Sequence, residues 1–95
     1  MKIQLQFSGG MELLFNNQRV IDIALPASII NLADLLAYTR DTFCTGNKDL
    51  FMAADTIRPG VLVLINDADW ELEGEGAYVV QEGDKIVFIS TLHGG

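Results

Sequence analysis

The residues with the clearest chemical potential are the last two, Gly94 and Gly95, of a chain of 95 residues. Because glycine has no Cβ atom, a Gly-Gly end adopts nearly any backbone conformation and can enter a channel too narrow for other residues. It would present a bare carboxylate, which ionises near pKa ~3.5 and is a ready nucleophile toward the α-phosphate of ATP. The same two residues are equally compatible with a frayed terminus that has no function.

His93, the only histidine, stands beside these glycines. An imidazole can perform acid-base chemistry near pH 7, but no serine or acidic residue is placed in the sequence to suggest a triad. We therefore favour recognition of His93 by a partner protein over catalysis. Cys44, the only cysteine, cannot form an internal disulfide and lacks an activating neighbour, so we assign it no role.

An acidic segment contains Asp67, Asp69, Glu71 and Glu73. A calcium or magnesium site would need convergent oxygen ligands, and the spacing lacks the full calcium-loop pattern. A solvated turn and loop explain the same residues, with a docking site for a partner enzyme as the functional alternative. Trp70, within this segment, is expected to be a core residue rather than a stacking platform for a ligand.

Composition excludes several classes of protein. A net charge of −7 argues against direct nucleic-acid binding, since a polyanion gains nothing from phosphate contacts. No apolar run approaches the ~20 residues that cross a bilayer, and the N-terminal residues do not form a signal-peptide core. We expect no membrane association and a cytoplasmic location, with the nucleus as a second. No P-loop, dinucleotide or zinc-ligand pattern occurs, so we expect no enzyme and no bound cofactor.

The N-terminal region predicts a β-hairpin. Residues 2–7 alternate between polar and apolar side chains, which is the signature of a half-buried strand, and residues 8–10 form a turn. The second strand falls either at Glu12–Phe15 or later, at Arg19–Leu25, with Asn16-Asn17 as a bend between them.

A helix is predicted over Leu32–Phe43 from its apolar period of 3.6 residues. Asn31 or Ser28 is expected to cap its start, and Gly46 to mark its stop. Strands are predicted at 61–65 and 85–90, and the segment 47–57 shows no sustained period. This order predicts an α+β fold, the β-grasp arrangement of ubiquitin, in which one main helix packs on one face of a mixed sheet.

Both C-terminal strands are apolar on both sides, although one helix can cover only one face of the sheet. Some of their residues are therefore expected to form an exposed apolar patch on the outer face, which would mark an interaction surface. The alternative is that the segment 47–57 folds over that face.

Two runs of sequence resemble the ubiquitin-related modifier family, the eukaryotic ubiquitin-like sulfur carriers. They are Arg58-Pro59-Gly60-Val61-Leu62-Val63-Leu64-Ile65-Asn66-Asp67-Ala68-Asp69-Trp70-Glu71-Leu72 and Phe88-Ile89-Ser90-Thr91-Leu92-His93-Gly94-Gly95. The resemblance implies a β-grasp domain over residues 1–90 and a flexible tail over 91–95. It implies that Gly95 is the modified residue and that Thr91, Leu92, His93 and Gly94 are recognised by partners.

The resemblance also implies a pathway. An activating enzyme would use ATP to adenylate the Gly95 carboxylate, and its rhodanese-type sulfur transfer would convert the adenylate to a thiocarboxylate. A separate tRNA thiolase complex would place that sulfur on the wobble uridine of certain tRNAs. The activated terminus could also be joined to lysines of target proteins, and Lys2, Lys48 and Lys85 could themselves accept a modifier. The carrier itself is expected to be a monomer.

Two alternatives stay open from the sequence. The chain could be a passive ubiquitin-like binding module that uses only its sheet face, in which case Gly94-Gly95 would be dispensable. It could also be a molybdopterin-type or thiamine-type sulfur carrier. The Leu92–Gly95 ending and the Asn66–Leu72 run favour the tRNA-thiolation branch.

Overall fold

The first strand, β1 (Lys2–Ser8), lies second from one edge of the main sheet. The computed structural model describes residues 1–91 of the chain. The alternation of side chains buries Ile3, Leu5 and Phe7 on one face. β1 pairs antiparallel with β2 (Val20–Ala24) and parallel with β7 (Lys85–Ser90). The predicted hairpin and the predicted last strand are therefore both present.

The chain between β1 and β2 forms a short 3₁₀ helix, Met11–Phe15, rather than a strand. Of the two expected positions for the second strand, Glu12–Phe15 is wrong and Arg19–Leu25 is close to the observed one. The physical reason is the turn chemistry on both sides of the helix. Gly10 precedes it at φ 99°, and Asn16 follows at φ 57°, so the backbone reverses too tightly at each end for an extended segment.

The helix α1 (Leu32–Phe43) has the predicted bounds, and Asn31 caps it rather than Ser28. Asn31 Oδ1 accepts a hydrogen bond of 2.9 Å from the backbone N–H of Asp34, and Asp34 Oδ2 accepts one of 3.2 Å from the N–H of Asn31. This reciprocal pair satisfies two amide groups that a helix start otherwise leaves without partners.

Gly46 does not end α1, because the helix has already stopped and Cys44 continues in an extended conformation. Gly46 lies instead against the 3₁₀ helix, where an added Cβ would come within 2.8 Å of Leu14 Cδ2. The glycine thus lies at a close approach between two segments, where a larger residue would require the Leu14 side chain to shift, rather than at a helix cap.

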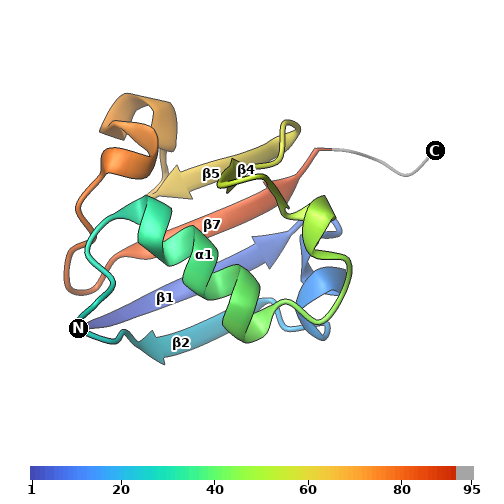
Figure 1. The fold of residues 1–95 in the computed structure, drawn as a ribbon, viewed down its shortest axis with the longest axis horizontal. Coiled ribbons are helices and arrows are strands. Elements are labelled where there is room, and N and C mark those ends of the chain that lie inside the picture. The colour runs from blue at the N-terminus through green and yellow to red at the C-terminus, as the bar shows by residue number, and fades with distance from the viewer. Residues whose placement is uncertain (92–95) are drawn as a thin grey trace.

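The main sheet has the strand order β2-β1-β7-β5-β6. Its mixed pairing and single main helix confirm the predicted α+β class and the β-grasp arrangement (Figure 1). The remaining elements are 3₁₀ helix Lys48–Leu50, β3 (Met52–Ala53), β4 (Thr56–Ile57), β5 (Val61–Ile65), β6 (Ala68–Asp69), and 3₁₀ helices Trp70–Glu73 and Glu75–Ala77.

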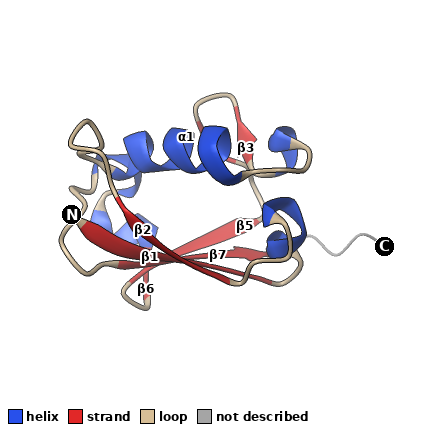
Figure 2. Cartoon of the chain, turned by 90° about the horizontal axis from the view of Figure 1, so that it is seen from below, coloured by secondary structure: helices blue, strands red, loops and turns tan. Residues whose placement is uncertain are grey.

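The core lies between the sheet and α1, and the segment 47–57 closes one end of it (Figure 2). Phe51, from that segment, is fully buried and contacts Phe15 and Phe88 edge-on, with ring centroids 5.2 Å apart in both pairs. Phe7 stacks on Phe15 at 3.9 Å. The segment therefore packs on the helix side, and the alternative that it covers the outer face is wrong. In the part of the chain that is described, no helix combines the length and apolar character needed to cross a bilayer.

Candidate functional site

The residue after the last strand is hydrogen-bonded to the turn that precedes β5. The backbone N–H of Thr91 donates a hydrogen bond of 2.9 Å to the carbonyl oxygen of Gly60. The Thr91 hydroxyl donates to the same oxygen, although the side chain is exposed. Val61 pairs with Ser90 in the adjacent sheet register. Thr91 therefore continues the pairing of β7 by one residue beyond the strand, and we call Ser90 and Thr91 the tail root.

A second turn packs against the tail root on the side of β1. Gly9, at φ 67°, lies so close to β7 that an added Cβ would come within 2.5 Å of the Ser90 carbonyl oxygen. Any other residue here would combine a strained backbone with a clash against main-chain atoms. The turns that contain Gly9 and Gly60 thus contact the end of β7 from its two neighbouring strands.

The other predicted tail residues, Leu92, His93, Gly94 and Gly95, lie outside the described residues, and their roles stay predictions. Covalent geometry still limits where they can act. Four residues beyond Thr91 span at most about 14 Å when fully extended. Any group that reacts with the Gly95 carboxylate must therefore come within about that distance of the tail root.

Beside the tail root, the outer face of β5 and β7 carries four apolar side chains in two cross-strand pairs. Leu62 pairs with Ile89, and Leu64 pairs with Val87. Leu62, Leu64 and Ile89 are half-buried and Val87 is 9% exposed, yet none of the four belongs to the core cluster beneath the sheet. The expected apolar patch is therefore present, although it is less exposed than the sequence suggested. We call these four residues the apolar strip.

The neighbouring half of the same face is polar. Gln4 and Gln6 of β1 and Asp22 of β2 are joined by side-chain hydrogen bonds of 2.7 and 3.0 Å. The boundary between the two halves falls between β1 and β7, where Gln6 lies opposite Val87. The apolar area thus ends at one strand and extends alongside the tail root, which favours it as a contact surface for a protein that grips the chain end.

The acidic segment lies at the end of β5 away from the tail root, since Val61 pairs with Ser90 and Ile65 with Ile86. Two of its side chains have structural partners: Asp67 Oδ1 is 2.9 Å from Lys85 Nζ, and Asp69 Oδ1 accepts from the N–H of Glu71. Across residues 1–91, no three His, Cys, Asp or Glu side chains are placed to share a metal ion.

Trp70 is 7% exposed and belongs to the core cluster, as the sequence predicted. Cys44 is also buried, with a free thiol. Neither side chain lies at a surface where it could bind a ligand.

Sequence reasoning missed a buried carboxylate. Asp84 is 4% exposed, and its oxygens accept hydrogen bonds from Asn66 Nδ2 at 2.8 Å, from the Tyr78 hydroxyl at 2.7 Å and from the Gln81 N–H at 2.8 Å. Desolvation of the phenol and its hydrogen bond to Asp84 raise the pKa of Tyr78 to about 12. The cluster ties the β5–β6 turn to the start of β7. In the sequence, residues 81–84 have only the composition of a turn, Gln-Glu-Gly-Asp, which gives no sign of these contacts.

Comparisons with known proteins agree with this arrangement. Residues 2–95 match the family model Urm1 (ubiquitin related modifier). The chain is 51% identical over 96 residues to a ubiquitin-related modifier 1 homolog of Dictyostelium discoideum, with 100% of both chains covered. It is 47% identical over 96 residues to ubiquitin-related modifier 1 of Candida glabrata, covering 99% of this chain and 98% of that one. The solution structure of Urm1 from Trypanosoma brucei has a TM-score of 0.84 and 38% identity, covering 99% of this chain and 95% of that chain.

Proposed function

The chain belongs to the Urm1 (ubiquitin related modifier) family, and we propose that it carries sulfur on the carboxyl group of Gly95. In this function the protein is a substrate of partner enzymes and has no active site or bound cofactor of its own. It acts as a monomer in the cytoplasm, and the nucleus is a second location.

The reaction sequence begins with a carboxylate oxygen of Gly95, which attacks the α-phosphate of ATP held by an adenylating enzyme. Pyrophosphate leaves and an acyl-adenylate forms. A persulfide of the enzyme's rhodanese-type domain then attacks the carboxyl carbon, and AMP leaves. A second thiol reduces the resulting acyl disulfide and is itself oxidised to a disulfide, which leaves a thiocarboxylate on Gly95. A tRNA thiolase complex uses that sulfur for 2-thiolation of the wobble uridine. The activated terminus can also be joined to lysines of target proteins, which makes the chain a protein modifier.

The observation that carries this proposal is the tail root. Thr91 is bonded to Gly60 by its backbone and its hydroxyl, so the body ends at a defined point, four residues before Gly95. A mixed anhydride such as an acyl-adenylate hydrolyses in water, and an enzyme protects it by enclosing the chain end. A short end that finishes in two glycines and starts from a hydrogen-bonded residue suits an enclosed site. The apolar strip offers a docking surface beside the tail root.

Incubation with the activating enzyme, ATP and a sulfur source tests the proposal. Intact-mass spectrometry is expected to show one terminal oxygen replaced by sulfur. Deletion of Gly95 is expected to abolish this change and to leave the unfolding midpoint in urea unaltered. An unchanged mass of the full chain in the presence of active enzyme would contradict the proposal.

Cellular complementation separates the tRNA branch from its alternatives. A chain whose Gly94-Gly95 has been removed is expected to lose 2-thiolated tRNA. If that truncated chain sustains tRNA thiolation, a passive binding module becomes the better description. If the full chain becomes thiocarboxylated but supports only molybdopterin or thiamine synthesis, the neighbouring carrier class is correct.

A further inference from the structure

The three lysines of the chain differ in what their ammonium groups contact. Lys48 Nζ donates to two backbone carbonyl oxygens near the end of α1, at 3.1 and 3.4 Å. Lys85 Nζ forms an ion pair of 2.9 Å with Asp67. A nitrogen engaged in this way must give up those contacts before its lone pair can attack a carbon atom. Lys2 Nζ, by contrast, has no hydrogen bond or ion pair with any residue in the range 1–91.

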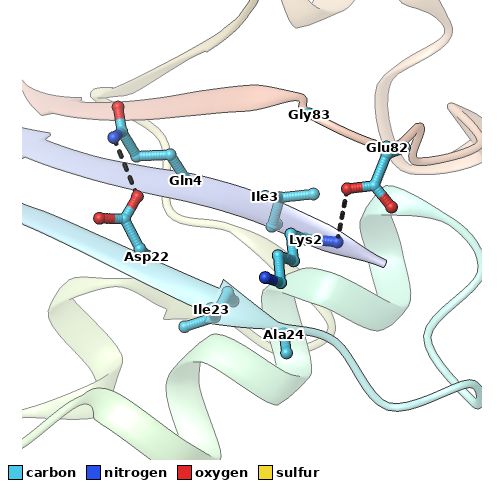
Figure 3. A pocket seen from close by; sticks show the side chains of 8 residues that line it. All are labelled: Lys2, Ile3, Gln4, Asp22, Ile23, Ala24, Glu82 and Gly83. Atoms are coloured by element: carbon cyan, nitrogen blue, oxygen red, sulfur yellow. Dashed lines mark hydrogen bonds between the residues drawn. The ribbon is translucent and has the colours of Figure 1, made fainter.

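Lys2 also lies in an open groove of about 490 Å³ on the polar half of the outer face (Figure 3). The groove is bordered by β1, β2 and the turn before β7; its other lining residues are Ile3, Gln4, Asp22, Ile23, Ala24, Glu82 and Gly83.

Both carboxylates of the groove are bonded elsewhere. Glu82 accepts from the backbone N–H of Lys2 at 3.0 Å, and Asp22 accepts from Gln4. In Figure 3 the Lys2 side chain extends toward the end of β2, on the side away from the Glu82 carboxylate. The ε-nitrogen is therefore both uncommitted and open to approach by another molecule.

The sheet geometry prevents the chain's own terminus from reaching this nitrogen. β1 and β7 run parallel, and Ser8 lies opposite Ile89. Lys2 is six residues before Ser8 and Thr91 is two residues beyond Ile89, which separates them by roughly 26 Å along the strands at 3.3 Å per residue. Four residues and an extended lysine side chain together span only about 20 Å. A bond between Gly95 and Lys2 therefore has to join two molecules.

We infer that Lys2 is the acceptor site at which the activated terminus of a second copy of this chain is attached. The inference rests on the proposed function, which supplies the Gly95 acyl-adenylate. The neutral ε-nitrogen of Lys2 attacks the carboxyl carbon of that adenylate, and a carbon–nitrogen bond forms. The bond between the same carbon and the AMP oxygen breaks, AMP leaves, and the amine proton passes to water. No oxidant or reductant is required, and the product is an isopeptide-linked dimer.

The experiment uses the full chain, the activating enzyme and ATP, without a sulfur source. Denaturing gels and intact-mass spectrometry measure the dimer, and tryptic peptides locate the junction. Trypsin cleaves after Lys85 and not within residues 86–95, so the acceptor lysine carries residues 86–95 as a branch. We expect this branch on Lys2. The variant Lys2→Arg is expected to lose the dimer, whereas Lys85→Arg, which keeps the positive charge beside Asp67, retains it.

ATP–pyrophosphate exchange in the same samples separates the possible failures. Three outcomes overturn the inference and leave the carrier function intact. The first is exchange without a dimer, and the second is a dimer that persists in Lys2→Arg. The third is a branch on Lys48, Lys85 or the Met1 amino group in place of Lys2. Absence of exchange with the wild-type chain and an enzyme that is active on another carrier overturns the proposed function, and the inference falls with it.

Discussion

The backbone N–H of Thr91 lies 2.9 Å from the carbonyl oxygen of Gly60, a residue 31 positions earlier in the chain. This bond makes Thr91 part of the folded body, although its side chain is exposed and it was expected to begin the flexible tail. The oxygen of Gly60 receives both the amide and the hydroxyl of Thr91. The position of the tail root is thus set by the turn that precedes β5.

Removal of the Thr91 hydroxyl is expected to weaken activation without unfolding the domain. Thr91→Val keeps the shape and the backbone bond but loses the side-chain bond, which contributes about 0.5–1.5 kcal/mol. We expect KM for the activating enzyme to rise about two- to ten-fold, with kcat nearly unchanged. Steady-state pyrophosphate exchange measures both parameters. Thr91→Ser keeps a hydroxyl, so its KM is expected to lie close to that of the wild-type chain. Equal increases of KM in both variants would argue against the hydroxyl's role.

Polar substitutions in the apolar strip are expected to impair docking of the activating enzyme. Leu62→Gln and Ile89→Gln place an amide where an apolar contact would be buried, and full burial of such a side chain contributes about 1.5–3 kcal/mol. The expected result is a KM increase of about ten-fold or more for each variant. Gln6→Ala, on the polar half of the same face, serves as the control and should leave KM unchanged. Urea unfolding of all three proteins checks that the fold is retained.

A side chain at Gly9 is expected to destabilise the protein more than one at the next position. Gly9 and Gly10 both have positive φ, at 67° and 99°, but only Gly9 has backbone atoms within reach of an added Cβ. The left-handed conformation alone costs about 1–2 kcal/mol for an alanine. We therefore expect Gly10→Ala to lose about that much stability in urea unfolding, and Gly9→Ala to lose at least about 1 kcal/mol more. Equal losses would show that the tail root tolerates displacement.

Tyr78 is expected to ionise unusually late. Burial of its phenol and its hydrogen bond to Asp84 favour the neutral form and raise the pKa to about 12, whereas the unfolded chain ionises near its ordinary value of about 10. Because the folded state holds this proton more tightly, the stabilisation is complete below about pH 10 and is lost as the pH rises toward about 12.

Ultraviolet absorbance of tyrosinate during an alkaline titration measures this ionisation. In Tyr78→Phe the absorbance change that belongs to Tyr78 is expected to be missing, which identifies it. Tyr38→Phe is the matched control because it removes the only other tyrosine. Ionisation of Tyr78 near pH 10 in the folded protein would contradict the contact with Asp84.

Elements with strong local patterns were predictable from the sequence, and those fixed by distant contacts were not. The bounds of α1 follow from its apolar period and from the Asn31 cap, and β5 from its run of β-branched and leucine side chains. Glu12–Phe15 carries apolar residues that also suit a strand, but the conformations of Gly10 and Asn16 decide for a 3₁₀ helix. Phe51 lies in a segment without any period, so its place among the core aromatic rings could not be foreseen.

The candidate site was predictable in its residue types but not in its connections. The terminal glycines and the two-sided apolar character of β5 and β7 are visible in the sequence. The bond from Thr91 to Gly60 depends on the register between two strands, which hydrophobic pattern alone does not fix when a strand is apolar on both faces. The role of Asp84 could not be predicted either, since nothing nearby in the chain shows that Asn66 and Tyr78 donate to it.

The placement of β7 between β1 and β5 has a consequence for biosynthesis. The strand made last is the one that joins the two halves of the sheet, so a ribosome must have released residue 90 before either half can complete its hydrogen bonds. A product that terminates before β7 therefore leaves the facing edges of β1 and β5 without the strand that pairs with both.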